Sequence, residues 1–311
     1  MSRVVNGSPR VTKDIIETVN AAISELNYVP NRAARSLASR RTLAIALVVP
    51  ETAARVFTDP FFASVVQGVA LYLAETEYTL NMVIASETNP DKTRRFLMGG
   101  NVDGALVVSH HSGDHSYAQL PLPIVFGGRP VGEDPSNSYY VDADNVAGAE
   151  LATEHLISRG RRNIAIIAGP QDMPGGVDRL TGWRRAMAKH GLDDTLIEYG
   201  DFSPASGTEA MRRLLMRRAP IDGLFATNDQ MGAGAYAAIL EAGLTIPASI
   251  AVVGFDDDQY GLAVTPPLTT VHQPSIELGT TMAKILVERL AGLTVDHATT
   301  LATDLVIRQS T

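Results

Sequence analysis

From residue 43 onward, apolar segments of strand length alternate with amphipathic segments of helix length, and this alternation limits the possible folds more than any other feature. Residues 43–50 form a continuous apolar run that ends at a proline, and residues 60–75 then carry apolar side chains at helical spacing. Apolar strands separated by helices predict parallel sheets covered by helices. The strand candidates are too many for one small sheet, so the sequence predicts an α/β fold with two doubly wound, Rossmann-like lobes. The further strand candidates are residues 79–85, 103–109, 123–127, 163–169, 222–227 and 249–255, and the further helix candidates are residues 90–99, 145–159, 178–190, 205–218, 229–242 and 275–291.

The composition agrees with a large globular protein. The chain has 311 residues, of which 45% are hydrophobic and 19% are charged, and this length accommodates two domains, each with its own core. No apolar run approaches the roughly 18 residues that a membrane span requires, and the first residues lack the apolar segment of a secretory signal. The absence of cysteine excludes disulfides and thiolate metal ligands. We therefore expect a cytoplasmic protein.

Charge is distributed unevenly along the chain. The net charge is −8, but residues 1–42 hold seven basic and three acidic side chains, which gives this segment +4 and leaves −12 for the rest. A basic segment on an acidic body favours an N-terminus that meets a polyanion. The alternative is an ordinary solvated cluster of charges.

The N-terminal segment has a pattern of its own. Residues 11–30 read as one helix with Thr12 at its N-cap and an apolar stripe, and Pro30 ends it. The following stretch, NRAARSLASRRT (31–42), carries four arginines and one large apolar residue, Leu37. It has no stripe that could hold it on a core, and isolated helices this short are marginal in water, so we expect it to become helical only when bound. The stripe comprises Ile15, Ile16, Val19, Ile23 and Leu26.

These N-terminal residues resemble a known family. The stretch SRVVNGSPRVTKDIIETVNAAISELNYVPNRAARSLASRRT is similar to the DNA-binding headpiece and hinge of the LacI (lactose repressor) family of bacterial transcription regulators. The resemblance covers essentially the whole chain, in consistent order and spacing. It continues through DPFF (59–62), GRRNIAIIAGP (160–170), DRLTGW (178–183), TNDQM (227–231), VVGFDD (252–257) and TPPLTTVHQP (265–274).

The resemblance implies a domain organisation. A helix-turn-helix headpiece would occupy residues 1–29 and a hinge helix residues 30–42, followed by a core like that of a periplasmic sugar-binding protein. Lobe 1 would comprise residues 43–143 and 273–295, and lobe 2 residues 144–272 and 296–311. The chain would cross between the lobes near 142–145, near 272–274 and close to the C-terminus. Such proteins work as homodimers on operator DNA and hold a small effector between the lobes, without a cofactor.

The resemblance also implies a role for the basic island. In the family, paired hinge helices enter the minor groove, and a leucine at the position of Leu37 wedges between base pairs; the bent duplex then contacts more protein, which offsets the unstacking. The alternative for Leu37 is a linker leucine packed on the core. The candidate DNA-binding residues are Ser2, Arg3, Asn6, Arg32, Ala34, Arg35 and Leu37.

The two ends of the chain depart from the family pattern. Residue 1 falls inside the recognition helix, so helix one and the turn are absent, and the sequence as written is expected to bind operator poorly. One explanation is a mis-called start or a truncation, which predicts upstream codons for about 20 further residues. The other is a real loss of DNA binding. The C-terminal residues LVIRQST carry no leucine heptads, which predicts a dimer rather than a tetramer.

The candidate effector site lies at strand ends, where doubly wound lobes bind ligands. Ser109, Asn228 and Asp256 each follow a strand candidate directly. Asp, Asn and Arg side chains with an aromatic face suit a sugar-like effector, although Gly128-Arg129 stands where sugar-responsive relatives often carry aspartate, so the effector's identity stays open. The resemblance implies effector contacts at Arg179, Phe202, Asn228, Asp256 and Gln273, with weaker first-lobe candidates at Asp59, Phe62, Ser109 and Arg129.

Three residues in the motifs quoted above also have a purely structural interpretation. Asp256 could be a helix-capping acid, Arg179 a surface ion pair and Trp183 a core aromatic.

The stretch GAGAYA (232–237) matches a dinucleotide-binding pattern, but its glycines fall inside the predicted helix instead of directly after the strand. The stretch HHSGDH (110–115) could suggest a metal, but no second ligand cluster is visible, so we expect a loop at the edge of the cleft and no metal.

The sequence therefore predicts an effector-responsive, DNA-binding transcription regulator, a repressor of a catabolic operon, and not an enzyme. The alternative is a solute-binding protein without DNA-binding activity. That protein would need an export signal and would have no use for residues 11–42.

Overall fold

The computed structural model describes residues 4, 11–26, 41–85, 90–112, 117, 119–130 and 138–311. All seven predicted DNA-binding residues lie outside these ranges. The N-terminal helix, α2 (Lys13–Glu25), begins directly after Thr12, which occupies the N-cap position without a side-chain hydrogen bond. The helix is shorter than the predicted 11–30, and none of its residues is buried. Among the described residues, no core lies against its apolar stripe, and Ile15 is 52% exposed.

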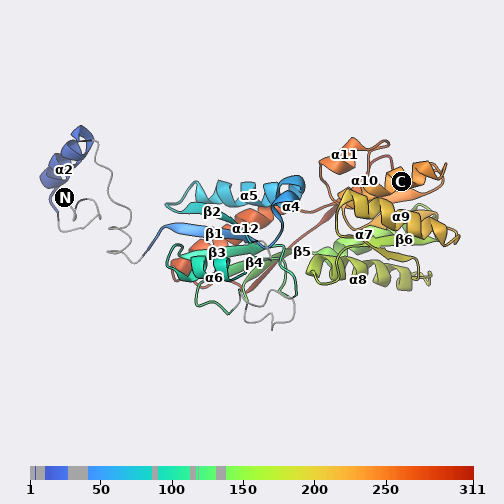
Figure 1. Ribbon diagram of the computed structural model, residues 1–311, viewed down its shortest axis with the longest axis horizontal. Coiled ribbons are helices and arrows are strands. Elements are labelled where there is room, and N and C mark those ends of the chain that lie inside the picture. The colour runs from blue at the N-terminus through green and yellow to red at the C-terminus, as the bar shows by residue number, and fades with distance from the viewer. Residues whose placement is uncertain are drawn as a thin grey trace.

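The first lobe is built on a six-stranded parallel sheet whose strands lie in the order β11-β5-β4-β3-β1-β2 (Figure 1). All six residues of the interior strand β1 are buried, and alternate residues face opposite sides. On one face of β1, Ile45, Leu47 and Val49 pack against α5 and α12. On the other face, Ala44, Ala46 and Val48 pack on the side of α6. The elements are β1 (Ala44–Val49), α4 (Ala53–Thr58), α5 (Pro60–Leu73), β2 (Thr79–Ile84), α6 (Pro90–Met98), β3 (Gly104–Val108), β4 (Ile124–Gly127), β5 (Tyr140–Ala143), α12 (Ser275–Leu290) and β11 (Ala298–Leu301).

The second lobe repeats this plan with the strand order β12-β10-β9-β8-β6-β7, in which only β12 is antiparallel to its neighbour. Helices α7 and α8 cover one face, where Trp183 is fully buried, and α9 and α10 cover the other. The elements are α7 (Asn145–Ser158), β6 (Ile164–Ala168), α8 (Pro174–Lys189), β7 (Ile197–Tyr199), α9 (Pro204–Met216), β8 (Gly223–Ala226), α10 (Asp229–Glu241), β9 (Ala251–Asp256), α11 (Gln259–Ala263), β10 (Thr269–His272) and β12 (Asp304–Val306). Two parallel α/β lobes, as predicted, make up the core.

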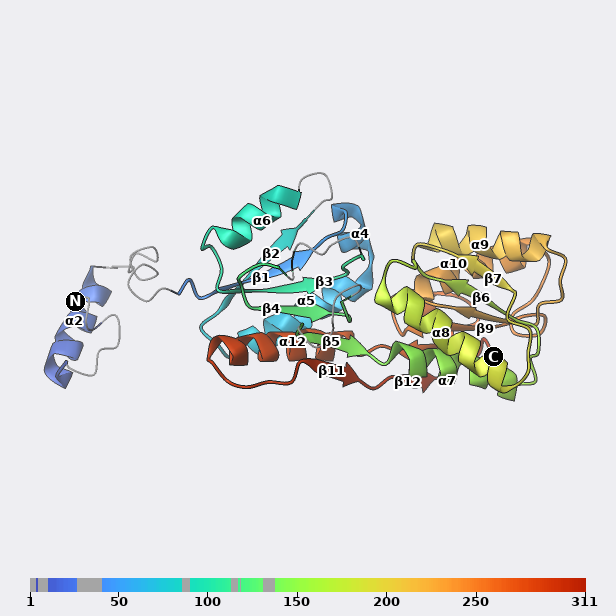
Figure 2. The same cartoon turned by 90° about the horizontal axis from the view of Figure 1, so that it is seen from below.

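The chain crosses between the lobes three times, side by side (Figure 2). The first crossing joins β5 to α7 around residue 144, the second joins β10 to α12 around residues 273–274, and the third joins β11 to β12 around residues 302–303. The predicted boundary at 295/296 is wrong for the third crossing, because β11 pairs with β5 and so belongs to the first lobe. An edge strand with exposed alternate residues carries too weak an apolar signal to be found in the sequence.

The glycines of GAGAYA have a packing role. They lie inside α10, as expected, and a Cβ on Gly234 would come within 1.9 Å of the Pro204 carbonyl oxygen. Glycine therefore lets α9 and α10 approach closely. Within the described ranges, no helix combines the length and apolar character needed to cross a membrane.

Candidate functional site between the lobes

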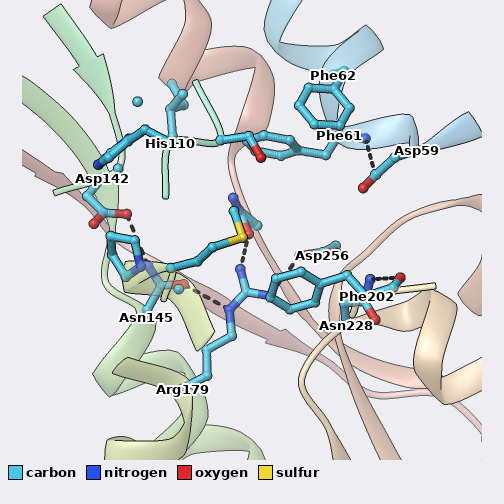
Figure 3. Close-up of a pocket in the computed structure, with 18 of the residues that line it drawn as sticks. Asp59, Phe61, Phe62, His110, Asp142, Asn145, Arg179, Phe202, Asn228 and Asp256 are labelled. Carbon is cyan, nitrogen blue, oxygen red and sulfur yellow. Dashed lines mark hydrogen bonds and ion pairs between the residues drawn. The ribbon is translucent and has the colours of Figure 1, made fainter. Parts of the chain in front are cut away.

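A cavity lies between the lobes, at the carboxyl ends of strands from both sheets, and encloses about 720 Å³ of empty space that includes open solvent (Figure 3). The structure brings eight of the nine predicted effector contacts to its wall. These are Asp59, Phe62, Ser109, Arg179, Phe202, Asn228, Asp256 and Gln273.

The ninth candidate, Arg129, does not line the cavity. Its guanidinium donates to both carboxylate oxygens of Asp178 on α8, at 2.9 and 3.0 Å, and so joins the first lobe to the second. Its backbone N–H donates to Asp142 at 2.9 Å. The acidic side chain on α8 holds the guanidinium, so Arg129 is an interlobe contact in this structure.

Arg179 is the most connected side chain of the cavity. It is 6% exposed, and its Nη1 donates to the Thr227 carbonyl at 2.6 Å and to Asp256 Oδ1 at 3.2 Å. Its Nε donates to Asn145 Oδ1 at 2.9 Å, and its Nη2 donates to Gln273 Oε1. Asn145 and Gln273 stand at the first and second crossings, so one guanidinium is bonded to both. Arg179 is therefore not a surface ion pair.

The Arg179–Asp256 pair is held in a poorly solvated place. Burial raises the pKa of Asp256, which the guanidinium of Arg179 opposes, and burial lowers the pKa of Arg179. Asp256 does not cap a helix, because the cap of α11 is Asp258, whose carboxylate accepts from the Tyr260 N–H at 2.7 Å. The structural interpretation of Asp256 as a helix cap is thus wrong.

Two other cavity residues do cap helices. Asn228 Oδ1 accepts from the Met231 N–H at 2.9 Å, and its Nδ2 donates to the Phe202 carbonyl at 3.0 Å. Asp59 accepts from the Phe61 N–H at 3.0 Å at the start of α5. Capping fixes both side chains at the rim of the cavity.

Three cavity residues have an unusual backbone. The φ angles of Ser109, Phe202 and Asp256 are 60°, 69° and 107°, in the left-handed region that favours glycine. Each costs of order 1–3 kcal/mol, a cost that proteins retain mostly at binding sites. This strain marks the same cavity independently of its side chains.

The sequence missed several side chains of the wall. Asp142 is the last residue but one of β5, a four-residue strand of alternating burial that was not predicted, and Asn145 follows at the first crossing. His110 directly follows the predicted Ser109, and Phe61 and Arg55 stand beside predicted residues on α5 and α4. A strand-end search that included short strands of alternating burial would have found Asp142.

The second histidine of HHSGDH joins the lobes. His111 Nδ1 donates to Asp172 Oδ2 at 2.8 Å, and His111 Nε2 lies 3.4 Å from Glu51 Oε1. The Ser112 N–H donates to the Asp172 carbonyl at 2.8 Å. The hydrogen bond to Glu51, with that to Asp172, raises the pKa of His111 to about 9. Among the described residues, no three His, Asp or Glu side chains are grouped as metal ligands.

We expect the stability contributed by His111 to depend on pH. Because its pKa is raised from 6.5 to about 9 on folding, this stability is fully present below pH 6.5 and is lost as the pH rises through 9. Asp172 is half exposed, so the ion pair is worth about 1 kcal/mol or less. Urea denaturation should therefore find His111→Gln less stable than the parent at pH 6 and equal to it at pH 10. Asp172→Asn should give the same profile, and a pH-independent difference would contradict this role.

Comparisons with known proteins agree on the class of protein. A family model of periplasmic binding protein-like domains matches residues 153–311. The chain is 43% identical to the HTH-type transcriptional regulator CelR of Thermobifida fusca, over 100% of this chain and 93% of that protein. A solved CelR–cellobiose complex is 41% identical, with a TM-score of 0.83 over 100% of this chain and 94% of that one. A lac repressor dimer bound to operator and the anti-inducer ONPF is 27% identical, with a TM-score of 0.87 over 99% and 93% of the two chains. This chain belongs to the LacI family of transcriptional regulators.

Proposed function

We propose that this protein is a repressor whose affinity for operator DNA is set by a small carbohydrate bound in the interlobe cavity. The observation that carries the proposal is the position of Arg179, which lines the cavity and is bonded to residues at two of the interlobe crossings, Asn145 and Gln273. A ligand that bonds to Arg179 therefore acts on the groups that fix how the lobes meet.

Such a ligand controls DNA binding only through a difference in affinity. It must bind one arrangement of the lobes more tightly than the other, and it then shifts the population toward that arrangement. The hinge segments of two subunits, residues 30–42, would come together in one arrangement and separate in the other. Coupling of typically about 1–3 kcal/mol changes operator affinity about 5- to 150-fold.

The cavity wall supports a carbohydrate as the effector. Phe202 offers a flat apolar face for a sugar ring, while Arg179, Asn228 and Asp256 offer polar groups around it. The similarity to a regulator solved with cellobiose makes that disaccharide the first ligand to test. We assign effector contacts to the eight predicted residues that line the cavity and leave Arg129 out.

The DNA-binding assignment rests on the family. We propose that residues 1–29 belong to the headpiece and 30–42 to the hinge, with Leu37 as the minor-groove wedge and Arg32 and Arg35 near phosphates. We place the lobe boundary at the third crossing, after β11, and propose a homodimer, as in the operator-bound lac repressor. Operator binding would place the protein in the cytoplasm.

A titration of operator binding tests the proposal. Protein that carries a complete helix-turn-helix headpiece is titrated by fluorescence anisotropy onto an operator fragment selected from random DNA, with and without a panel of mono- and disaccharides that includes cellobiose. We expect one sugar to change operator affinity by about fivefold or more. Sugar binding by a protein that never binds DNA would revive the solute-binding alternative, and failure of every sugar to bind or to change operator affinity would refute a carbohydrate effector.

A further inference from the structure

The first-lobe side of the cavity carries three side chains that offer hydrogen-bond acceptors. Asp59 precedes α5, His110 follows β3 after one residue, and Asp142 is the last residue but one of β5 (Figure 3). Asp256, Gln273 and Asn228 also line the cavity, but they already accept hydrogen bonds within the protein.

His110 has an acceptor atom without a protein partner. Its Nε2 lies 3.3 Å from the Arg129 carbonyl oxygen, which can only accept, so Nε2 carries the proton and Nδ1 is a bare acceptor. The residue is 5% exposed, and Nδ1 has no hydrogen-bond partner among the residues that the structure describes. Burial lowers the pKa of His110 to about 4, so the ring is neutral at pH 7. A buried acceptor left without a donor costs free energy, which a donor group on a ligand would recover.

Both carboxylates have acceptor capacity to spare. Asp142 accepts from the Arg129 N–H at 2.9 Å and from Asn145 Nδ2 at 3.0 Å, one bond on each oxygen. Asp59 accepts from the Phe61 N–H at 3.0 Å, and a hydrogen bond from Gln230 also favours its ionised form, as one from the Ala143 backbone does for Asp142. A carboxylate offers about four lone-pair positions, so each can take further donors. Burial raises the pKa of Asp59 and raises that of Asp142 to about 6, which shows that neither is fully compensated by cations.

The cations at the cavity are already paired. Arg179 lies 3.2 Å from Asp256, and Arg55 lies 3.4 Å from Glu51. Arg129, just outside, is paired with Asp178. The segments of the two lobes that the structure leaves undescribed, residues 86–89, 113–116, 118 and 131–137, contain no lysine or arginine in the sequence. An anionic ligand would meet carboxylates here without an unpaired cation.

We propose that Asp59, His110 and Asp142 form an acceptor subsite that binds hydroxyl donors of an uncharged carbohydrate and rejects the phosphorylated or carboxylated form of the same sugar. This inference rests on the proposed function and adds the charge of the effector to it. The carboxylates of Asp59 and Asp142 discriminate between ligands by charge. A sugar hydroxyl can donate to them, whereas a phosphate or carboxylate on the ligand is repelled. His110 supplies a neutral acceptor that fixes the orientation of one hydroxyl.

Matched pairs of sugars test the subsite. Isothermal titration calorimetry at pH 7.5 measures binding of cellobiose and cellobiouronic acid, of glucose and glucose 6-phosphate, and of ribose and ribose 5-phosphate to the full chain. In any pair that binds, we expect the neutral sugar to bind at least about tenfold more tightly, since a buried charge interaction of this kind exceeds about 1.4 kcal/mol. An anionic member that binds as tightly as its neutral partner would overturn the subsite alone. If no sugar binds, the carbohydrate effector itself is refuted.

Single substitutions then test whether Asp59 and His110 cause the preference for neutral sugars. Asp59→Asn keeps the oxygen that caps α5 but removes the charge, so the ratio of neutral-sugar to anionic-sugar affinity should fall about tenfold. His110→Phe keeps a flat ring and removes the acceptor, so it should weaken binding of the neutral sugar about tenfold without changing that ratio. Asp304→Asn removes an exposed carboxylate on β12, outside the cavity, and should leave both unchanged. Thermal midpoints without ligand show that each variant folds. Equal discrimination in folded Asp59→Asn and Asp304→Asn would refute the assignment to Asp59.

Discussion

Replacing Arg179 by alanine should lower effector affinity at least about 100-fold and should also destabilise the protein. The substitution removes a ligand contact and leaves Asp256 as a buried carboxylate without its partner. Breaking a buried ion pair in this way costs about 3–5 kcal/mol. Calorimetry measures effector affinity, and urea denaturation measures the free energy of unfolding.

A second variant separates the two effects. Asp256→Asn keeps the size of the side chain and removes the charge, so the protein should remain folded while effector affinity falls by about tenfold or more. Operator affinity of Asp256→Asn without effector should stay near that of the parent, because Arg179 keeps its bonds to Asn145 and Gln273 at the crossings. Parental effector binding by either folded variant would show that the residue is not a contact. A loss of operator binding by the folded variant without effector would make its role structural.

Replacing Leu37 by alanine in the full-length regulator should reduce operator affinity by at least about tenfold, since burying a leucine side chain is worth about 1.5–3 kcal/mol. The bend of the operator should also decrease. The arginines remain, so the dependence of affinity on salt should hardly change. Anisotropy titrations over a range of salt concentrations, with gel mobility for the bend, measure these quantities.

Arg35→Ala is the matched control for Leu37→Ala. If Arg35 contacts a phosphate, its loss should weaken operator binding and reduce the salt dependence, because fewer counterions are released on binding. The two substitutions thus differ in their effect on the salt dependence of affinity, which Arg35→Ala should reduce and Leu37→Ala should leave unchanged. Parental affinity and bending in Leu37→Ala would mean that the leucine is a linker residue packed on the core.

The sequence by itself determined the class of fold and one side of the site. Strands buried on both faces must be apolar at every position, as β1 is, and this local signal needs no knowledge of the neighbours. Ser109, Asn228 and Asp256 could be selected because the carboxyl ends of parallel strands meet at one edge of a sheet. The strands β5, β7, β10, β11 and β12 were not predicted, whereas β4 and β8, of similar length, were. The missed strands are not buried at every position, so they lack the continuous apolar run by which β4 and β8 are recognised.

Only the tertiary structure decided which of these side chains work together. Arg179 meets Asn145 and Gln273 across 34 and 94 residues of sequence, and His111 meets Asp172 across 61. Apolar periodicity reports which face of an element is buried, but it is silent about which polar group stands opposite across an interlobe cavity. The free acceptor of His110 and the pairing of Arg129 with Asp178 follow from how the two lobes meet, because a hydrogen bond depends on distances of a few tenths of an ångström that local sequence does not specify.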